Sequence, residues 1–339
     1  MGDIVMASPV AETIKRERPN SHICWMVQPE YRLLLEDNPY VDEVICWDKK
    51  HWQSLFKQHK YLSLWREIRA LKKRLQSKKF EFAIDLQGLL KSGFLAWLSG
   101  AKHRIGLGSR EGSGLLMTKT ISRNMGDQAQ IGSEYRYIVN QLGFPEKEWQ
   151  MLVPVSEEIA ASSRALLPEG FGDDAYAVIC PFTTRPQKHW FDDYWQQLIL
   201  RIRGRYQLRT IILGGPAEQA QGEQLARGNG AINLAGSTSL QQAGAIIKNA
   251  SLLIGVDTGL THMGHAFKIP TIALFGSTCP YSHTGLETSS IIYLDKFCSP
   301  CKRNPTCGGK FQCMREITPD LVLTELKSLM KNFYESPAR

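Results

Sequence analysis

The segment GVDTGLTH, at residues 255–262, combines a carboxylate, two hydroxyls and a histidine around two glycines. An apolar run ends before it and a helical pattern starts within it. Unpaired N–H groups and the positive end of a helix dipole would make such a junction an anion site. A second interpretation is that Asp257 and Thr258 only cap the helix. His262 could likewise be an interior histidine.

Two further segments follow predicted strands in the same way. The segment PFTTRPQKHW, at residues 181–190, offers Thr183, Thr184 and Lys188, which suit the oxygen-rich surface of a phosphate. The segment LGGP, at residues 213–216, leads to Glu218, which is either a partner for ribose hydroxyls or a first-turn acid favoured by the helix dipole. Since open α/β sheets bind ligands at the carboxyl ends of their strands, the three segments together predict a nucleotide site.

The first half carries similar signals. DLQGLLKS, at residues 85–92, also follows a predicted strand and opens a helix. Asp85 could be structural at that turn, while Gln87 and Lys91 could contact an acceptor. Asp3 starts its own helix, where it either caps the helix or faces a cleft and takes a proton from an attacking hydroxyl.

Four of the eight cysteines lie close together near the end of the chain. They are Cys298, Cys301, Cys307 and Cys313. Four thiolates within 16 residues could form a structural zinc site, but their spacing matches no standard zinc ribbon, so free thiols are an equal alternative. The other four cysteines lie in or beside apolar runs and are interpreted as small core residues.

The second half has the alternation needed to position these segments. Short runs rich in Ile, Val and Leu predict buried parallel strands at residues 176–182, 208–214, 231–235, 252–256 and 271–275. Helical patterns lie between them at residues 193–205, 217–227, 239–249 and 260–268, and a last helix is predicted at residues 319–334. This succession predicts an open, doubly wound α/β sheet.

The first half also alternates strand and helix patterns, but less regularly. Its predicted strands are residues 22–27, 44–47, 82–85 and 103–107, and its predicted helices are residues 4–16, 61–73, 89–98 and 132–142. With 339 residues, two domains are expected, and we place them at residues 1–152 and 153–339.

No strand precedes the predicted helix at residues 4–16, although Gly2-Asp3 has the character of a strand-to-helix turn. We expect that a first strand of roughly nine residues belongs before it, the alternative being a short N-terminal helix.

Composition and charge limit the class of protein. The chain is 43% apolar and 22% charged, with no secretion signal and no apolar run of the length that spans a bilayer. The eight cysteines are therefore expected in a reducing cytoplasm, as thiols or metal ligands. The net charge is +8, but residues 49–79 alone hold 11 Lys and Arg and one acid. That local cationic surface, with aromatic residues among the charges, suits anionic lipid headgroups or a phosphorylated glycolipid better than nucleic acid. A solvated helix face is the alternative.

These segments together resemble glycosyltransferase family 9, the ADP-heptose:lipopolysaccharide heptosyltransferases. The shared motifs are GDIVMASPV (2–10), AIDLQGLLKSG (83–93), HRIGL (103–107), PFTTRPQKHW (181–190), GVDTGLTH (255–262) and CxxC…CMREITPDLV (298–322). The resemblance implies an α/β GT-B fold, in which two Rossmann-like doubly wound domains face each other across a cleft. The first domain would bind mainly the acceptor and the second the nucleotide sugar.

The resemblance also implies roles for single residues. Asp3 matches the candidate general base of the family. The residues that match donor contacts are Thr183, Thr184, Lys188, Glu218, Asp257, Thr258 and Gly259, with His262 nearby. The chain departs from the family in having no strand before Gly2-Asp3, and the cysteine cluster occurs in only some members.

The expected activity is therefore inverting transfer of a heptose from ADP-L-glycero-D-manno-heptose to the inner core of lipopolysaccharide, on Kdo or on the first heptose. The segment TTRPQKHW favours the first heptose transfer. No metal cofactor is expected, apart from the alternative of a structural zinc. The expected partners are the ADP-sugar, a lipid A-linked oligosaccharide and the anionic inner face of the cytoplasmic membrane, with no nucleic acid. The alternatives are an epimerase-like GT-B protein and an inactive homologue that lacks its first strand.

Overall fold

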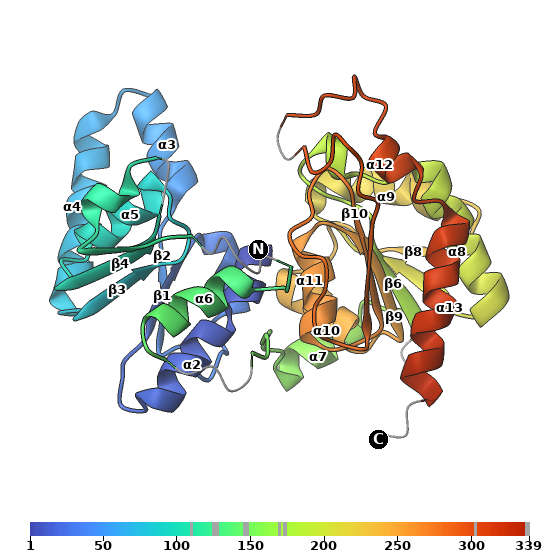
Figure 1. Ribbon diagram of the computed structural model, residues 1–339, viewed down its shortest axis with the longest axis horizontal. Coiled ribbons are helices and arrows are strands. Elements are labelled where there is room, and N and C mark those ends of the chain that lie inside the picture. The colour runs from blue at the N-terminus through green and yellow to red at the C-terminus, as the bar shows by residue number, and fades with distance from the viewer. Residues whose placement is uncertain are drawn as a thin grey trace.

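The computed structural model shows two α/β halves that meet near the N-terminus (Figure 1). It describes residues 1–108, 111–123, 129–144, 149–168, 171, 175–301 and 304–335, without the side chains of residues 332–335. Among these residues, no helix combines the length and the apolar character that crossing a bilayer requires.

The second half is built on one parallel sheet of six strands in the order β11-β10-β9-β6-β7-β8. The strands are β6 (Tyr176–Cys180), β7 (Arg209–Ile212), β8 (Ile232–Asn233), β9 (Leu252–Val256), β10 (Thr271–Phe275) and β11 (Ser289–Tyr293). Five of them confirm the predicted strands. Strands β6, β9 and β10 are buried along their whole length, as expected for a parallel sheet covered on both faces.

Two apolar layers cover this sheet. One layer contains Trp195 and Leu198 of a long helix, and the other contains Ile246 and Met263. The helices of this half are α7 (Glu157–Arg164), α8 (Asp192–Tyr206), α9 (Gln219–Ala226), α10 (Leu240–Lys248), α11 (Gly259–Ala266), α12 (Gln312–Arg315) and α13 (Pro319–Glu335), with short 3-10 turns η3 (Pro186–Lys188) and η4 (Pro216–Glu218). The predicted doubly wound architecture is confirmed here.

The first half has two small parallel sheets instead of one. Strands β1 (Cys24–Val27) and β2 (Glu43–Cys46) form one sheet. Strands β3 (Phe82–Asp85), β4 (His103–Leu107) and β5 (Lys119–Ile121) form the other. The four predicted strands are present, but the described part of the chain does not join them into one sheet.

The helices of the first half are α1 (Gly2–Ala7), α2 (Pro9–Glu17), α3 (Lys49–Lys57), α4 (Tyr61–Ser77), α5 (Leu90–Leu98) and α6 (Ser133–Gln141), with 3-10 turns η1 (Pro29–Leu34) and η2 (Ser113–Leu116). The single helix predicted at residues 4–16 is wrong in one respect, because the structure divides it at Ser8. Pro9 has no N–H to continue the α1 ladder and instead occupies the first position of α2.

The halves contact each other through the start of the chain. Helix α1 packs against α11, and Val5 is buried in the same apolar cluster as Leu260. The Gln241 side chain of the second half donates to the Leu33 carbonyl of the first half over 2.9 Å. The first residues of the chain are therefore held against the second half.

Candidate active site between the halves

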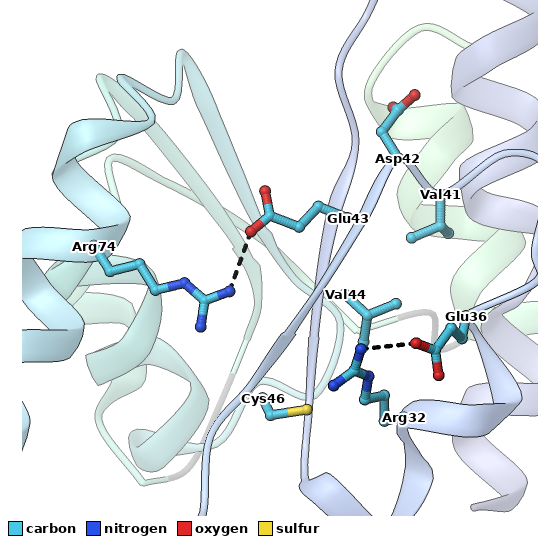
Figure 2. A pocket seen from close by; sticks show the side chains of 8 residues that line it. All are labelled: Arg32, Glu36, Val41, Asp42, Glu43, Val44, Cys46 and Arg74. Carbon is cyan, nitrogen blue, oxygen red and sulfur yellow. Dashed lines mark hydrogen bonds and ion pairs between the residues drawn. The ribbon is translucent and has the colours of Figure 1, made fainter.

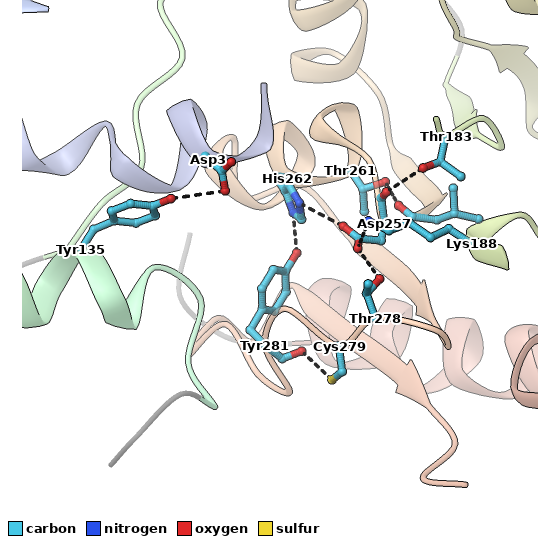
Figure 3. Close-up of polar contacts among 11 residues, drawn as sticks. Asp3, Tyr135, Thr183, Lys188, Asp257, Thr261, His262, Thr278, Cys279 and Tyr281 are labelled. Carbon is cyan, nitrogen blue, oxygen red and sulfur yellow. Dashed lines mark hydrogen bonds and ion pairs between the residues drawn. The ribbon is translucent and has the colours of Figure 1, made fainter. Parts of the chain in front are cut away.

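The segments that follow β6 and β9 meet at one edge of the six-stranded sheet. The two strands are neighbours, with Cys180 paired to Gly255, so the loops that leave them lie side by side. Lys188 Nζ lies 2.5 Å from Asp257 Oδ2, and Thr183 Oγ1 donates to the Asp257 carbonyl over 3.3 Å (Figure 3). The predicted meeting of the 181–190 and 255–262 segments is present in the structure.

Asp257 is the centre of a partly enclosed charge cluster. Its carboxylate accepts from Lys188 and from Thr278 Oγ1, and its Oδ1 lies 3.6 Å from His262 Nε2. Burial alone would raise the pKa of Asp257, but the attraction of His262 and Lys188 outweighs burial and holds that pKa well below its usual range. Asp257 is therefore a carboxylate at neutral pH, and it holds the Lys188 ammonium in place.

The capping interpretation of this junction is not supported. Thr258 occupies the N-cap position of α11, but its side chain makes no capping hydrogen bond. The side chain of Asp257 is engaged with Lys188 and Thr278 instead. The first N–H groups of α11 are thus left without a side-chain cap, which suits an anionic ligand.

His262 belongs to this cluster and is not a simple core histidine. It is 3% exposed, and its Nδ1 lies 2.7 Å from Tyr281 Oη. Burial raises the pKa of Tyr281 well above its usual value, and the charge of Asp257 adds to the effect. Tyr281 therefore keeps its proton, and its hydroxyl can donate to His262 Nδ1. That bond would leave the Nε2 proton directed at Asp257.

The first half brings Asp3 to the same place. A Cβ on Gly2 would lie 2.6 Å from a carbon of the His262 ring, so glycine is needed for α1 to lie this close to α11. Asp3 is exposed, and its Oδ1 accepts from Tyr135 Oη over 3.3 Å. The structure thus places the candidate base on one side of the boundary between the halves and the His262–Asp257–Lys188 cluster on the other (Figure 3).

Tyr135, Thr278 and Tyr281 are functional candidates that the sequence interpretation missed. Thr278 and Tyr281 follow β10, the neighbour of β9, so the strand-end rule could have found them. Tyr135 lies on α6, far along the chain from Asp3, and no sequence pattern connects the two. Burial raises its pKa well above the usual value, with Asp3 and Glu134 adding to the effect, so its hydroxyl stays protonated and donates to Asp3.

Met1 lies over the amino end of α11. Its side chain comes within 2.4 Å of the position that a Cβ on Gly259 would take. A ligand that reaches the Gly259 backbone from this side must displace Met1.

The remaining predicted donor residues lie nearby but are less constrained. Thr184 is exposed, and Thr258 is half-buried. The Glu218 carboxylate oxygen would lie 2.8 Å from a Cβ on Gly215, so this carboxylate lies beside the glycine turn that follows β7. This position leaves both interpretations of Glu218 open.

The predicted acceptor residues follow β3. Asp85 is structural, since its Oδ1 accepts from the Gln87 and Gly88 N–H groups and its Oδ2 accepts from Ser92 Oγ. Gln87 is exposed, and its carbonyl accepts from Arg123. Burial and the charge of Lys49 lower the pKa of Lys91, while Asp3 and Asp85 act in the opposite direction. Lys91 therefore lies within the electrostatic range of the candidate base.

The four clustered cysteines lie in the loop after β11 and around α12. Among the described residues, the group of three potential ligand atoms within 4.8 Å of one another is His22, Cys24 and Glu43, and none of the four clustered cysteines belongs to it. The four thiols still influence one another. Burial raises the pKa of Cys313, and Cys301, Cys298 and Cys307 raise it further.

A pocket of about 400 Å³ lies beside β2, away from the charge cluster (Figure 2). Its volume would admit a small ligand. Its charged side chains are already paired, Arg74 with Glu43, Arg32 with Glu36, and Asp42 with Lys15. The chemistry of a phosphate site is found at Lys188 and the start of α11, so we place the functional site there.

Comparison with known proteins identifies the family that the chain resembles. The family model described as glycosyltransferase family 9 (heptosyltransferase) matches residues 68–311. Lipopolysaccharide heptosyltransferase 1 of Pseudomonas aeruginosa is 26% identical, and the match covers 97% of this chain and 95% of that protein.

Solved structures agree in fold. A family 9 glycosyltransferase from Veillonella parvula has a TM-score of 0.78 at 21% identity, covering 99% of this chain and 94% of that chain. The Escherichia coli heptosyltransferase WaaC with ADP-2-deoxy-2-fluoro heptose has a TM-score of 0.72 at 23% identity, covering 96% of each chain. The predicted GT-B class is confirmed.

Proposed function

Because this chain belongs to glycosyltransferase family 9, we propose that it transfers a heptose from ADP-L-glycero-D-manno-heptose to the inner core of lipopolysaccharide, with inversion at the anomeric carbon. The observation that carries the proposal is the meeting of Asp3 with the His262–Asp257–Lys188 cluster. A base from one half and a phosphate-binding cluster from the other are the two parts that direct displacement requires.

Asp3 takes the proton from the acceptor hydroxyl as that oxygen attacks the anomeric carbon. Its carboxylate is exposed, and Tyr135 donates to Oδ1, which leaves Oδ2 for the acceptor. Tyr135 thus orients the carboxylate. Attack from the side opposite the leaving group breaks the bond to ADP in one displacement and inverts the configuration, without a covalent intermediate.

The departing ADP gathers negative charge on its diphosphate. Lys188 and the uncapped N–H groups at the start of α11 stabilise that charge, with Thr184 as a hydroxyl donor and Thr183 as a second donor once it exchanges the Asp257 carbonyl for the diphosphate. Asp257 supports this role indirectly, because its ion pair fixes Lys188 in the loop after β6 before the donor binds. We assign Glu218 to the ribose, since it lies at the third strand end of the same sheet edge.

The transfer needs no divalent metal in this mechanism. The chain contains no Asp-x-Asp motif of the kind that holds a diphosphate–metal complex. The cysteines 298, 301, 307 and 313 lie after β11 and contribute no group to the charge cluster, so the mechanism uses neither their thiols nor a structural zinc.

The acceptor binds on the first half, beside Gln87 and Lys91, and its lipid part lies at the inner face of the cytoplasmic membrane. Helices α3 and α4 pack against each other and expose a ridge of large apolar side chains, which we name the α3–α4 ridge: Phe56, Tyr61, Leu62 and Trp65. Exposed cations flank it at positions that include Lys57, Lys60, Arg66 and Arg69. Apolar side chains within a cationic surface suit an anionic leaflet.

The test is a reaction of purified protein with ADP-heptose and a heptose-free lipid A–Kdo acceptor, in EDTA. We expect a product heavier by one heptose, release of ADP, and an inverted anomeric centre by NMR. The donor alone should remain unchanged. Conversion of the donor without acceptor would indicate an epimerase instead, and a requirement for added metal would contradict the mechanism.

The acceptor position is tested in the same assay. An acceptor that already carries the first heptose should react more slowly, because the segment at residues 183–190 favours the first transfer. A higher rate on that acceptor would assign the enzyme to the second heptose.

A further inference from the structure

Arg123 follows β5 and spans the edge of the sheet at which three strands end. Strands β3, β4 and β5 are parallel neighbours in that order, so their carboxyl ends lie along one edge. Arg123 Nε donates to the Gly108 carbonyl, just after β4, over 3.0 Å, and Arg123 Nη2 donates to the Gln87 carbonyl, in the loop after β3, over 2.8 Å. One side chain therefore joins the segments that leave all three strands.

The loop after β3 is shaped to receive this contact. Gly88 has a φ of +63°, and a Cβ there would lie 2.7 Å from the Leu107 carbonyl oxygen and 3.0 Å from Arg123 Nη2. Glycine is therefore needed for the loop to lie this close to β4 and to the guanidinium. Asp85 Oδ1 accepts from the Gln87 and Gly88 N–H groups. The loop is thus held through its N–H groups by Asp85 and through one carbonyl by Arg123.

The same guanidinium contacts the helix that carries Tyr135. Arg123 Nη1 donates to Glu134 Oε1, in the first turn of α6, over 2.6 Å. Tyr135 is the next residue of α6, and its hydroxyl donates to Asp3 Oδ1. Burial raises the pKa of Tyr135, and the charge of Arg123 opposes that rise, so Arg123 lies within electrostatic range of the hydroxyl. Arg123 therefore connects the loop at Gln87 to the side chain that orients the candidate base.

We propose that Arg123 is a positioning residue for the transfer reaction, which fixes the loop at residues 85–92 relative to the Asp3–Tyr135 pair. The inference rests on the proposed function, which assigns Asp3 as the base and this loop to the acceptor. All three guanidinium nitrogens of Arg123 are hydrogen-bonded within the first half, so the residue acts through the groups that it holds. A planar guanidinium donates in several fixed directions at once, whereas lysine would keep the charge and lose that geometry.

The test compares the wild-type chain with Arg123→Gln and Arg123→Lys. The matched control is Arg104→Gln, because Arg104 also joins two carbonyls of the first half, those of Ala101 and Leu116, but lies near the start of β4. We expect Arg123→Gln to lower kcat/KM for the lipid A–Kdo acceptor by ~10–100-fold, the scale for misplacing reacting groups, with the affinity for ADP unchanged. Arg123→Lys, which keeps the charge beside Glu134, should fold like the wild type and lose nearly as much activity. Arg104→Gln should retain the wild-type kcat/KM.

The double variant Arg123→Gln/Tyr135→Phe measures whether Arg123 acts through Tyr135. We expect its kcat to be no lower than that of the more impaired single variant, because residues that act as a unit are not additive. Losses that multiply, or equal losses of activity in Arg123→Gln and Arg104→Gln, would reduce Arg123 to a general stabilising residue and overturn the proposal.

Hydrogen exchange tests the contact without substrate. The Gln87 and Gly88 amides should exchange at least ~10-fold faster in Arg123→Gln than in Arg104→Gln, and equal rates would contradict the proposal. A wild-type chain that transfers no heptose would refute the proposed function, and the exchange comparison would still decide whether Arg123 holds the loop. An active wild type with a normal kcat/KM in Arg123→Gln would refute this inference alone.

Discussion

The two halves of the chain are both built from parallel strands and helices, yet they differ in how deeply they bury the strands that carry their site residues. In the second half, β6 and β9 are fully buried in a six-stranded sheet; Asp257 follows β9 directly, and Lys188 lies in the loop after β6. In the first half, β1 and β3 are only partly buried, and Asp3 and Gln87 are exposed. The half that we propose to bind the nucleotide therefore holds its site residues on a buried sheet, whereas the half that we propose to bind the acceptor holds them on partly buried strands.

The largest effect should come from the first half. Asp3→Ala should lower turnover by ~10²–10⁴-fold, because it removes the base, while the Tm stays unchanged because Asp3 is exposed. Steady-state rates with ADP-heptose and acceptor measure this. Asp3→Asn keeps the shape and the Tyr135 contact, so a near-normal rate in that variant would remove Asp3 from the mechanism.

The stability of the halves can be compared by core truncation. Ile254→Ala in β9 should destabilise its half by ~2–5 kcal/mol, since Ile254 is fully buried between two helical layers. Met26→Ala in β1 should lower the free energy of unfolding by about 1 kcal/mol, because Met26 is only partly buried. Urea unfolding measures both. Equal losses of unfolding free energy in the two variants would mean that the first half is packed as completely as the second.

Nucleotide binding should depend on one half only. Lys188→Met should weaken ADP binding by ~10–100-fold, the range for losing a charged hydrogen-bond donor. Lys91→Met should leave ADP binding unchanged and raise the KM for the acceptor. Calorimetry and kinetics separate the two.

Lys188→Met also leaves Asp257 with one fewer partner, so the double variant Lys188→Met/Asp257→Asn is the control for folding. If the double variant recovers ADP affinity, the lysine does not contact the diphosphate.

The free energy of unfolding should depend on pH because of His265, which lies in the second half. Its ring is 1% exposed, with Nδ1 3.0 Å from Ser289 Oγ, and burial lowers its pKa to about 3. Between about pH 6.5, the pKa of His265 in the unfolded chain, and about pH 3, His265 is protonated in the unfolded chain but not in the folded protein. Stability is therefore lost as the pH falls through this window, by about 1.4 kcal/mol per pH unit.

The check is urea unfolding between pH 6.5 and 5, a range above the titration of Asp257. His265→Gln should remove most of this slope. The same slope in wild type and variant would show that His265 is protonated in the folded protein.

The smallest expected effect is on vesicle binding by the α3–α4 ridge. Trp65→Ser on the α3–α4 ridge should reduce binding to anionic vesicles by roughly three- to tenfold, as expected for loss of one partly inserted aromatic side chain. Leu200→Ser on α8 is the matched control, since Leu200 is 53% exposed and Trp65 is 51% exposed. Equal losses in a sedimentation assay would contradict a membrane-facing first half.

Much of this difference between the halves could be predicted from the sequence. Continuous apolar runs, such as residues 252–256, marked the buried strands of the second half correctly. Strands β5 and β11 were missed because they lie at sheet edges and begin with polar residues, Lys119 and Ser289. The division of the predicted helix at Ser8 is caused by Pro9. The prediction missed it because the apolar periodicity continues through this position.

The candidate site was predictable only where it follows strands. Lys188, Asp257 and His262 come together because β6 and β9 are neighbours. The contact of Tyr135 with Asp3 depends on how α6 and α1 pack, and the sequence contains no local signal for it. The ion pair of Lys188 with Asp257 was also not predicted, since both had been assigned separately to the donor.

Hydrogen exchange of the wild-type chain with and without ADP tests most directly whether the diphosphate binds at Lys188 and the amino end of α11. We expect slower exchange in the loop at residues 181–190 and at the start of α11, around residues 257–262, with little change in the strands of the first half. Protection centred on the pocket beside β2, or none at α11, would contradict the claim that Lys188 and the α11 amino end hold the diphosphate.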